Sequence, residues 1–66
     1  MQITLNGKPH QTSEGARLAQ LIEQLELTEQ RLAIEVNETL VPRSEHPRYT
    51  LQPGDRVEIV HAIGGG

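Results

Sequence analysis

The sequence predicts a small α+β domain in which one helix lies across a mixed β-sheet. Three observations predict this class: an alternating apolar segment near the start, one amphipathic helical stripe after it, and further alternating segments beyond the stripe. At 66 residues the chain has the size of one domain. A leading hairpin, a single helix and later strands are typical of α+β proteins.

The first segment predicts a β-hairpin. Ile3 and Leu5 alternate with polar residues, which is the period of a half-buried strand. Asn6-Gly7 is the strongest short hairpin signal, because a type I′ turn needs positive φ at both central positions. The returning strand, about Lys8 to Thr12, is polar and contains a proline, so we expect it at a sheet edge.

The second segment predicts an amphipathic helix near Ala16 to Glu26. Its apolar stripe has helical spacing and consists of Leu18, Leu21, Ile22 and Leu25. The start of the helix is poorly marked. Ser13 is a candidate cap, but Gly15 follows it and the capping-box position carries neither Glu nor Gln.

Further strands follow the helix. Ile34 and Val36 alternate with Ala33, Glu35 and Asn37 and predict a third strand. After a turn at 37–39, Leu40-Val41 predicts a short return strand, and the prolines and serine between residues 42 and 47 predict irregular structure.

The last strand is introduced by a turn. Gln52-Pro53-Gly54-Asp55 matches a type II turn, with Pro at the second position and Gly at the third. Val57 and Ile59 then share one face of the final strand, whereas Val60 and Ala62 share the other.

This order of elements predicts a β-grasp domain, the ubiquitin-like plan, with a mixed sheet of four to five strands and one helix packed across it. We expect the domain to span residues 1–63 and a flexible glycine tail to span 64–66. The predicted core comprises Ile3, Leu5, Leu18, Leu21, Ile22, Leu25, Ile34, Val36, Leu51, Val57 and Ile59.

Composition argues against several classes of function. The net charge is −3 and no basic cluster occurs, which argues against a nucleic-acid partner. Tyr49 is the only aromatic residue, so base stacking has little to use. The absence of cysteine precludes disulfides and fits a cytoplasmic protein. No apolar run approaches the roughly 20 residues of a membrane span, and the first residues lack a signal-peptide pattern.

The interior of the sequence offers no active-site motif. His10, His46 and His61 are widely separated, so we interpret them as surface histidines and expect no metal site. We expect His61 to end the last strand at the edge of the domain. Ser13 and Ser44 have no neighbouring base that would make them nucleophiles. These residues predict that the chain is not an enzyme.

The sequence ends in Gly64-Gly65-Gly66. Glycine at a turn must connect two segments, and here no residue follows, so we interpret these glycines as a narrow arm that presents a terminal carboxylate. An α-carboxyl group has a pKa of about 3.5, so it is ionised at neutral pH and must be activated, for example by adenylation, before a nucleophile can attack. Fixing three glycines costs roughly 3–6 kcal/mol, so the folded body must supply the binding surface.

The candidate docking surface is the sheet side that bears Val60 and Ala62, next to Ile63 and the glycine arm. The alternative is that Val60 and Ala62 pack within the domain, and the sequence does not decide between this packing and a docking surface.

The chain resembles the ThiS family of sulfur carrier proteins of thiamine biosynthesis along essentially its whole length. The resemblance is carried by Ile3-x-Leu5-Asn6-Gly7, the helix leucines, Glu35-Val36-Asn37, Val41-Pro42-Arg43, Gly54-Asp55-Arg56-Val57 and Gly65-Gly66. The diglycine is shared by several ubiquitin-like families, but the combination is more specific. Ala16 departs from the pattern, since related chains often place a capping threonine there.

The resemblance implies a mechanism at Gly66. An E1-like adenylyltransferase would use ATP and Mg²⁺ to form an acyl-adenylate, with no cofactor bound by the carrier itself. A persulfide sulfur, supplied from cysteine by a desulfurase, would displace AMP and leave a thiocarboxylate. Thiazole synthase would then take this sulfur. Arg43 belongs to the motif, and either a surface salt bridge or a docking contact would explain it.

Three alternatives stay open on the sequence alone. A sulfur carrier for molybdopterin synthesis has a similar fold and terminus, although such carriers look longer and richer in phenylalanine, which this chain lacks. A protein modifier would form isopeptide bonds through Gly66. A passive interaction module would not need its glycines.

Overall fold

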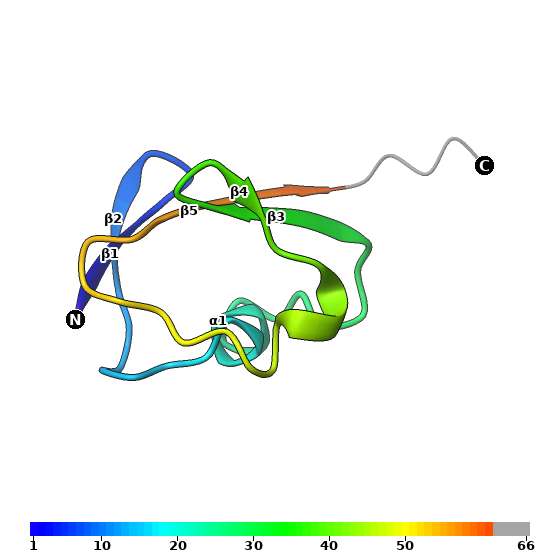
Figure 1. Cartoon of the computed structure of the whole chain (residues 1–66), viewed down its shortest axis with the longest axis horizontal. Helices are drawn as coiled ribbons and strands as arrows, with labels where there is room; N and C mark the ends of the chain where they lie inside the picture. The colour runs from blue at the N-terminus through cyan, green and yellow to red at the C-terminus, as the bar shows by residue number, and fades with distance from the viewer. Residues whose placement is uncertain (62–66) are drawn as a thin grey trace.

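The computed structural model describes residues 1–61 and has the predicted order of elements (Figure 1). Ala62, Ile63, the predicted tail 64–66 and therefore the predicted domain boundary lie outside the described residues. The elements are β1 (Gln2–Leu5), β2 (Lys8–Gln11), α1 (Leu18–Gln24), β3 (Leu32–Val36), β4 (Thr39–Leu40), the 3₁₀ helix η1 (Arg43–Glu45) and β5 (Arg56–His61).

The strands form one five-stranded sheet in the order β2-β1-β5-β3-β4. β1 and β5 run parallel, whereas the other neighbouring strands run antiparallel, so the sheet is mixed as predicted. Figure 1 shows α1 lying against one face of this sheet. The N-terminus and the end of β5 lie at opposite ends of the molecule. The β-grasp prediction is confirmed.

The turns of the sheet have the predicted backbone angles. Asn6 and Gly7 have φ of 48° and 82°, as a type I′ hairpin requires. Gly54 has φ of 83°, as expected for the third residue of a type II turn. The turn between β3 and β4 also uses positive φ, 52° at Asn37 and 70° at Glu38. β2 lies at a sheet edge, as predicted, and pairs only with β1 in the sheet. A proline is tolerated in an edge strand because one side of that strand makes no ladder hydrogen bonds.

The helix is shorter than predicted and begins later. Its N-cap is Arg17, and the Gln20 side-chain oxygen accepts a hydrogen bond from the Arg17 backbone N–H at 2.7 Å. Ser13 does not cap the helix; its carbonyl instead accepts a turn hydrogen bond from Ala16 N–H at 3.1 Å. Ala16 precedes the helix, and its side chain is buried. The predicted start was therefore wrong by two residues. The side-chain acceptor at the start of the helix is Gln20, which lies in the first helical turn, and not a residue that precedes the helix.

The core lies between α1 and the inner face of the sheet. Of the predicted core residues, Leu5 and Leu25 are only half-buried, and Ala16 and Val41 are buried in addition to the prediction. The core cluster comprises Ile3, Leu18, Leu21, Ile22, Ile34, Val36, Val41, Leu51, Val57 and Ile59. Burying a large aliphatic side chain contributes about 1.5–3 kcal/mol, so these contacts hold the single helix on the sheet.

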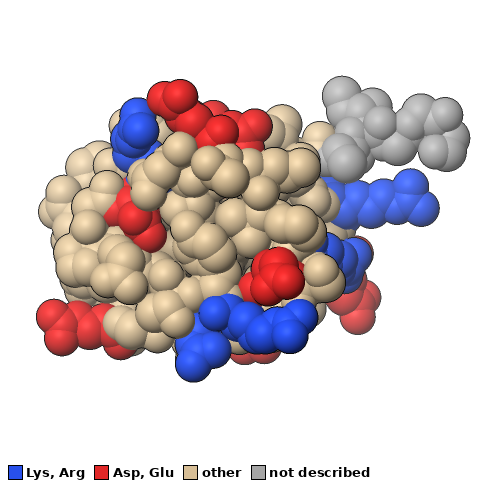
Figure 2. All heavy atoms as spheres, in the orientation of Figure 1, with Lys and Arg blue, Asp and Glu red and all other residues tan. Residues whose placement is uncertain are grey.

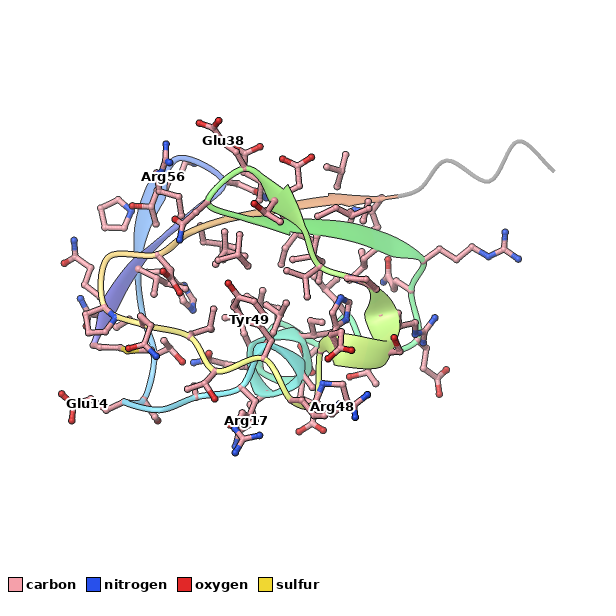
Figure 3. All side chains as sticks on the ribbon, in the orientation of Figure 1. Glu14, Arg17, Glu38, Arg48, Tyr49 and Arg56 are labelled. Atoms are coloured by element: carbon pink, nitrogen blue, oxygen red, sulfur yellow. The ribbon has the colours of Figure 1, made fainter. Side chains whose placement is uncertain are left out.

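The segment from residue 41 to 51 covers the open side of this core. Its backbone is bound to the chain around the start of α1, through Leu18 N–H to the Tyr49 carbonyl and Leu51 N–H to the Ala16 carbonyl, both at 2.8 Å. Figure 3 shows Tyr49 lying between α1 and the sheet. The irregular structure predicted for 42–47 contains η1, a single 3₁₀ turn.

Candidate functional site

The candidate site begins where β5 ends, at His61, because residues 62–66 continue from this strand. β5 is the central strand of the sheet, between β1 and β3. Its pairing with β3 continues to its last residue, with Ala33 opposite Val60 and Leu32 opposite His61. The predicted end of the strand at His61 is confirmed. A central strand that is paired up to its last residue gives the following segment a fixed starting point.

Asn6 extends the support of β5 on the other side. Residue-to-residue pairing with β1 covers only the first part of β5, at Arg56 and Val57. The Asn6 side chain then continues the ladder: its oxygen accepts from Ile59 N–H at 2.8 Å, and its amide nitrogen donates to the Ile59 carbonyl at 3.3 Å. Sequence analysis assigned Asn6 only to the turn, because a contact over 53 residues leaves no local pattern.

A buried carboxylate fixes the start of β5. Asp55 is 8% exposed and accepts from Gln52 N–H at 2.8 Å and from the Asn37 amide at 3.0 Å. The Asn37 side-chain oxygen accepts in turn from Arg56 N–H at 2.9 Å. These bonds join the turn before β5 to the turn after β3. The two motif segments Glu35-Val36-Asn37 and Gly54-Asp55-Arg56-Val57 are therefore in direct contact.

The outer face of the sheet, away from α1, carries two exposed large apolar side chains. Val60 is 58% exposed and Leu40 is 61% exposed. Leu40 is opposite Glu35 in the β3–β4 ladder, and Glu35 is opposite Glu58 in the β3–β5 ladder, so all three share this face. Val60 therefore does not pack within the described domain. The sequence analysis did not include Leu40 in the candidate docking surface, because a two-residue strand is too short to show which face its residues occupy.

The same face carries negative charge. Glu35 and Glu58 lie directly opposite each other, an arrangement that destabilises a sheet. The two salt bridges among the described residues, Arg48–Glu45 and Arg56–Glu38, include neither of them. Figure 2 shows acidic side chains gathered along the upper edge of the molecule, and Figure 3 places Glu38 there. We call the surface formed by Leu40, Val60, Ala33, Glu35 and Glu58 the outer sheet patch.

The histidine predictions are partly corrected. His46 is 7% exposed, and its Nε2 lies 3.0 Å from the Val41 carbonyl, so it is a buried residue and not a surface one. His10 is half-buried, with its Nε2 buried and unpaired in the described part of the chain. His61 is exposed. No group of three or more potential metal ligands gathers within residues 1–61.

Arg43 lies at the start of η1 and is exposed. Its Nη2 donates to the Thr28 carbonyl at 3.5 Å, a long hydrogen bond. The surface salt bridge considered for Arg43 is not formed among the described residues.

Within residues 1–61, no helix is both long and apolar enough to cross a membrane.

The chain matches the family model described as the ThiS family over residues 3–66. The chain belongs to the ThiS family. It is a sulfur carrier of thiamine biosynthesis, and proteins of this family are carriers rather than enzymes. Together with the relatives described next, this membership favours thiamine biosynthesis over molybdopterin synthesis.

Known relatives agree with this membership. The chain is 32% identical to the sulfur carrier protein ThiS of Escherichia coli K12, with both chains covered completely. The crystal structure of the thiamine biosynthesis protein ThiS from Geobacter metallireducens superposes with a TM-score of 0.87 at 29% identity, again over both whole chains. The chain is also 39% identical to part of a thiazole synthase of Magnetococcus marinus, but spans only 20% of the length of that protein.

Proposed function

We propose that this ThiS-family chain carries sulfur as a thiocarboxylate on Gly66. The observation that carries the proposal is the family match through residue 66, which includes the terminal glycines. An E1-like adenylyltransferase uses ATP, with Mg²⁺ bound to the nucleotide, to join AMP to the Gly66 carboxylate and release pyrophosphate. A persulfide, loaded from cysteine by a desulfurase, displaces AMP, and cleavage of the resulting acyl disulfide by a thiol leaves the thiocarboxylate. The carrier itself binds no cofactor in this scheme.

The thiocarboxylate then supplies sulfur to thiazole synthase. A relative named thiazole synthase contains a segment 39% identical to this whole chain, which supports a working partnership between the two kinds of domain. Thiols have a pKa of about 8.5, and thioacids are much more acidic. The sulfur is therefore ionised at neutral pH without a tuned pocket, which suits a carrier that has no cysteine.

We assign docking of the adenylating enzyme to the outer sheet patch together with Ala62 and Ile63, and we assign docking of thiazole synthase to a surface that includes Arg43, on the α1 side of the sheet. Residues 62–66 can reach at most about 18 Å from His61, so an enzyme that acts on Gly66 must bring its surface close to the end of β5. Val60 lies one residue before that end and is exposed. Its apolar surface and the nearby carboxylates of Glu35 and Glu58 favour a partner surface that combines apolar and basic side chains.

A reconstitution experiment tests the proposal. The chain is incubated with the adenylating enzyme, ATP, Mg²⁺, a desulfurase and cysteine, and its intact mass is recorded. We expect the mass to rise by the difference between one sulfur and one oxygen. A chain lacking Gly65 and Gly66 serves as the matched control and should unfold at the same temperature without gaining mass. Mass gain by this truncated chain would contradict the assignment to Gly66. Isopeptide products on gels would favour a protein modifier instead.

A further inference from the structure

A second surface feature lies on the α1 side of the molecule, away from the outer sheet patch. It is a hollow of about 150 Å³ between α1, the segment 27–30, the start of β3 and η1. Its walls are mainly apolar, and the apolar side chains that form them are Ala19, Ile22, Leu27, Leu32 and Pro47. An apolar cavity of about this volume accepts a molecule of the size of benzene. The hollow is therefore large enough for one leucine or phenylalanine side chain.

The rim of the hollow carries a cation with free donors. Arg43 lines the hollow, and its side chain makes only one hydrogen bond within residues 1–61, the long bond to the Thr28 carbonyl at 3.5 Å. No carboxylate lies within 4.0 Å of its guanidinium among the described residues. A guanidinium presents five donors in a planar fork that fits a carboxylate. Glu23 on α1 also lines the hollow. The hollow therefore carries one negative and one positive side chain, and an anionic group would bind on the side of Arg43.

The hollow lies near the strand that leads to Gly66. Leu32 forms part of its wall and is opposite His61 in the β3–β5 ladder. A protein that receives residues 62–66 can therefore contact the end of β5 and this hollow together. The outer sheet patch and the hollow then lie on either side of the same strand end.

We propose that the hollow binds a bulky apolar side chain of thiazole synthase, next to a carboxylate of that enzyme that pairs with Arg43. This inference rests on the proposed function. We choose thiazole synthase as the occupant because a ThiS-like segment occurs within a relative of that name, which makes the synthase a lasting neighbour of this fold. Buried aromatic anchors and arginines are also the residue types that dominate binding energy at interfaces.

The experiment measures binding of the carrier to purified thiazole synthase. The carrier is used with its ordinary carboxylate terminus, so the result does not depend on sulfur loading. Ala19→Leu fills the hollow with a good helix former, and Arg43→Glu reverses the charge at the rim. Arg48→Glu is the matched control, because Arg48 lies on the same covering segment but does not line the hollow, and its contacts among residues 1–61, a pair with Glu45 and a hydrogen bond to the Ser44 carbonyl, are exposed.

We expect Ala19→Leu and Arg43→Glu each to raise the Kd for the synthase at least tenfold, Arg43→Lys to have a smaller effect, and Arg48→Glu to have none. Adenylation by the activating enzyme and the thermal midpoint should be unchanged in all variants. Wild-type affinity of the first two variants would overturn the inference. A fall in thermal midpoint with unchanged affinity would show instead that Arg43 only tethers η1 to residue 28. Loss of adenylation alone would assign the hollow to the other partner and also overturn it.

Discussion

Asn6 and Ile59 are joined by two hydrogen bonds between one side-chain amide and one backbone unit. Asn6 thereby links the first turn of the chain to the last strand, two residues before its end. Because β1 stops at Leu5, the amide of Asn6 takes the place of the next strand residue. A turn residue thus helps to hold the strand that precedes the proposed carrier site at Gly66.

We predict that Asn6→Gly destabilises the protein by about 1–2 kcal/mol, because glycine keeps the positive φ but loses both hydrogen bonds. Urea unfolding measures the loss, and the slope of the free energy against urea should stay constant. Hydrogen exchange adds a local test, since the Ile59 amide should exchange faster in the variant. Equal stability of the two chains would show that the bonds to Ile59 add nothing.

A second prediction concerns the buried carboxylate of Asp55. Asp55→Ala removes the acceptor for Gln52 N–H and for the Asn37 amide, so we expect a loss of about 2–4 kcal/mol. Glu14→Ala is the matched control, because Glu14 is exposed and projects from the domain in Figure 3. Its effect should stay within about 0.5 kcal/mol. Similar unfolding midpoints for the two variants would contradict a structural role for Asp55.

Much of this framework could be predicted because its signals are local. The hairpin at Asn6-Gly7, the turn at Gly54 and the alternation of Val57 and Ile59 each depend on neighbours in sequence. The burial of His46 could not be predicted, since it depends on a fold that brings the Val41 carbonyl to its ring. Likewise, the opposition of Glu35 and Glu58 exists only through strand pairing. Local chemistry predicts elements, whereas buried polar contacts and surface patches need the topology.

The third prediction separates stability from docking at the Glu35–Glu58 pair. Glu58→Gln removes a like-charge repulsion and should stabilise the fold by about 0.2–1 kcal/mol at low salt, less at high salt. The same change should weaken binding of the adenylating enzyme if that enzyme presents basic side chains. Glu29→Gln, at an exposed position outside the sheet, is the control and should change neither property. Tighter binding by the Glu58 variant would argue against a basic partner surface.

A fourth prediction addresses the apolar part of the outer sheet patch. Val60→Lys and Leu40→Lys should lower kcat/KM for adenylation about tenfold, because fully burying a valine or leucine side chain contributes about 1.5–3 kcal/mol and lysine would place a charge there instead. Both side chains are exposed, so the unfolding midpoint should hardly change. Gln11→Lys, on the far edge strand, provides the control. Normal kinetics in both variants would mean that partners approach from another face.

The central claim is tested most directly by locating the sulfur. After reaction with the adenylating enzyme, ATP, Mg²⁺, a persulfide donor and a thiol, the carrier is digested and its C-terminal peptide is fragmented in a mass spectrometer. We predict that the mass difference between sulfur and oxygen appears only in fragments that contain Gly66. Sulfur on any other residue, or a C-terminal peptide that keeps both oxygens after this reaction, would contradict the account.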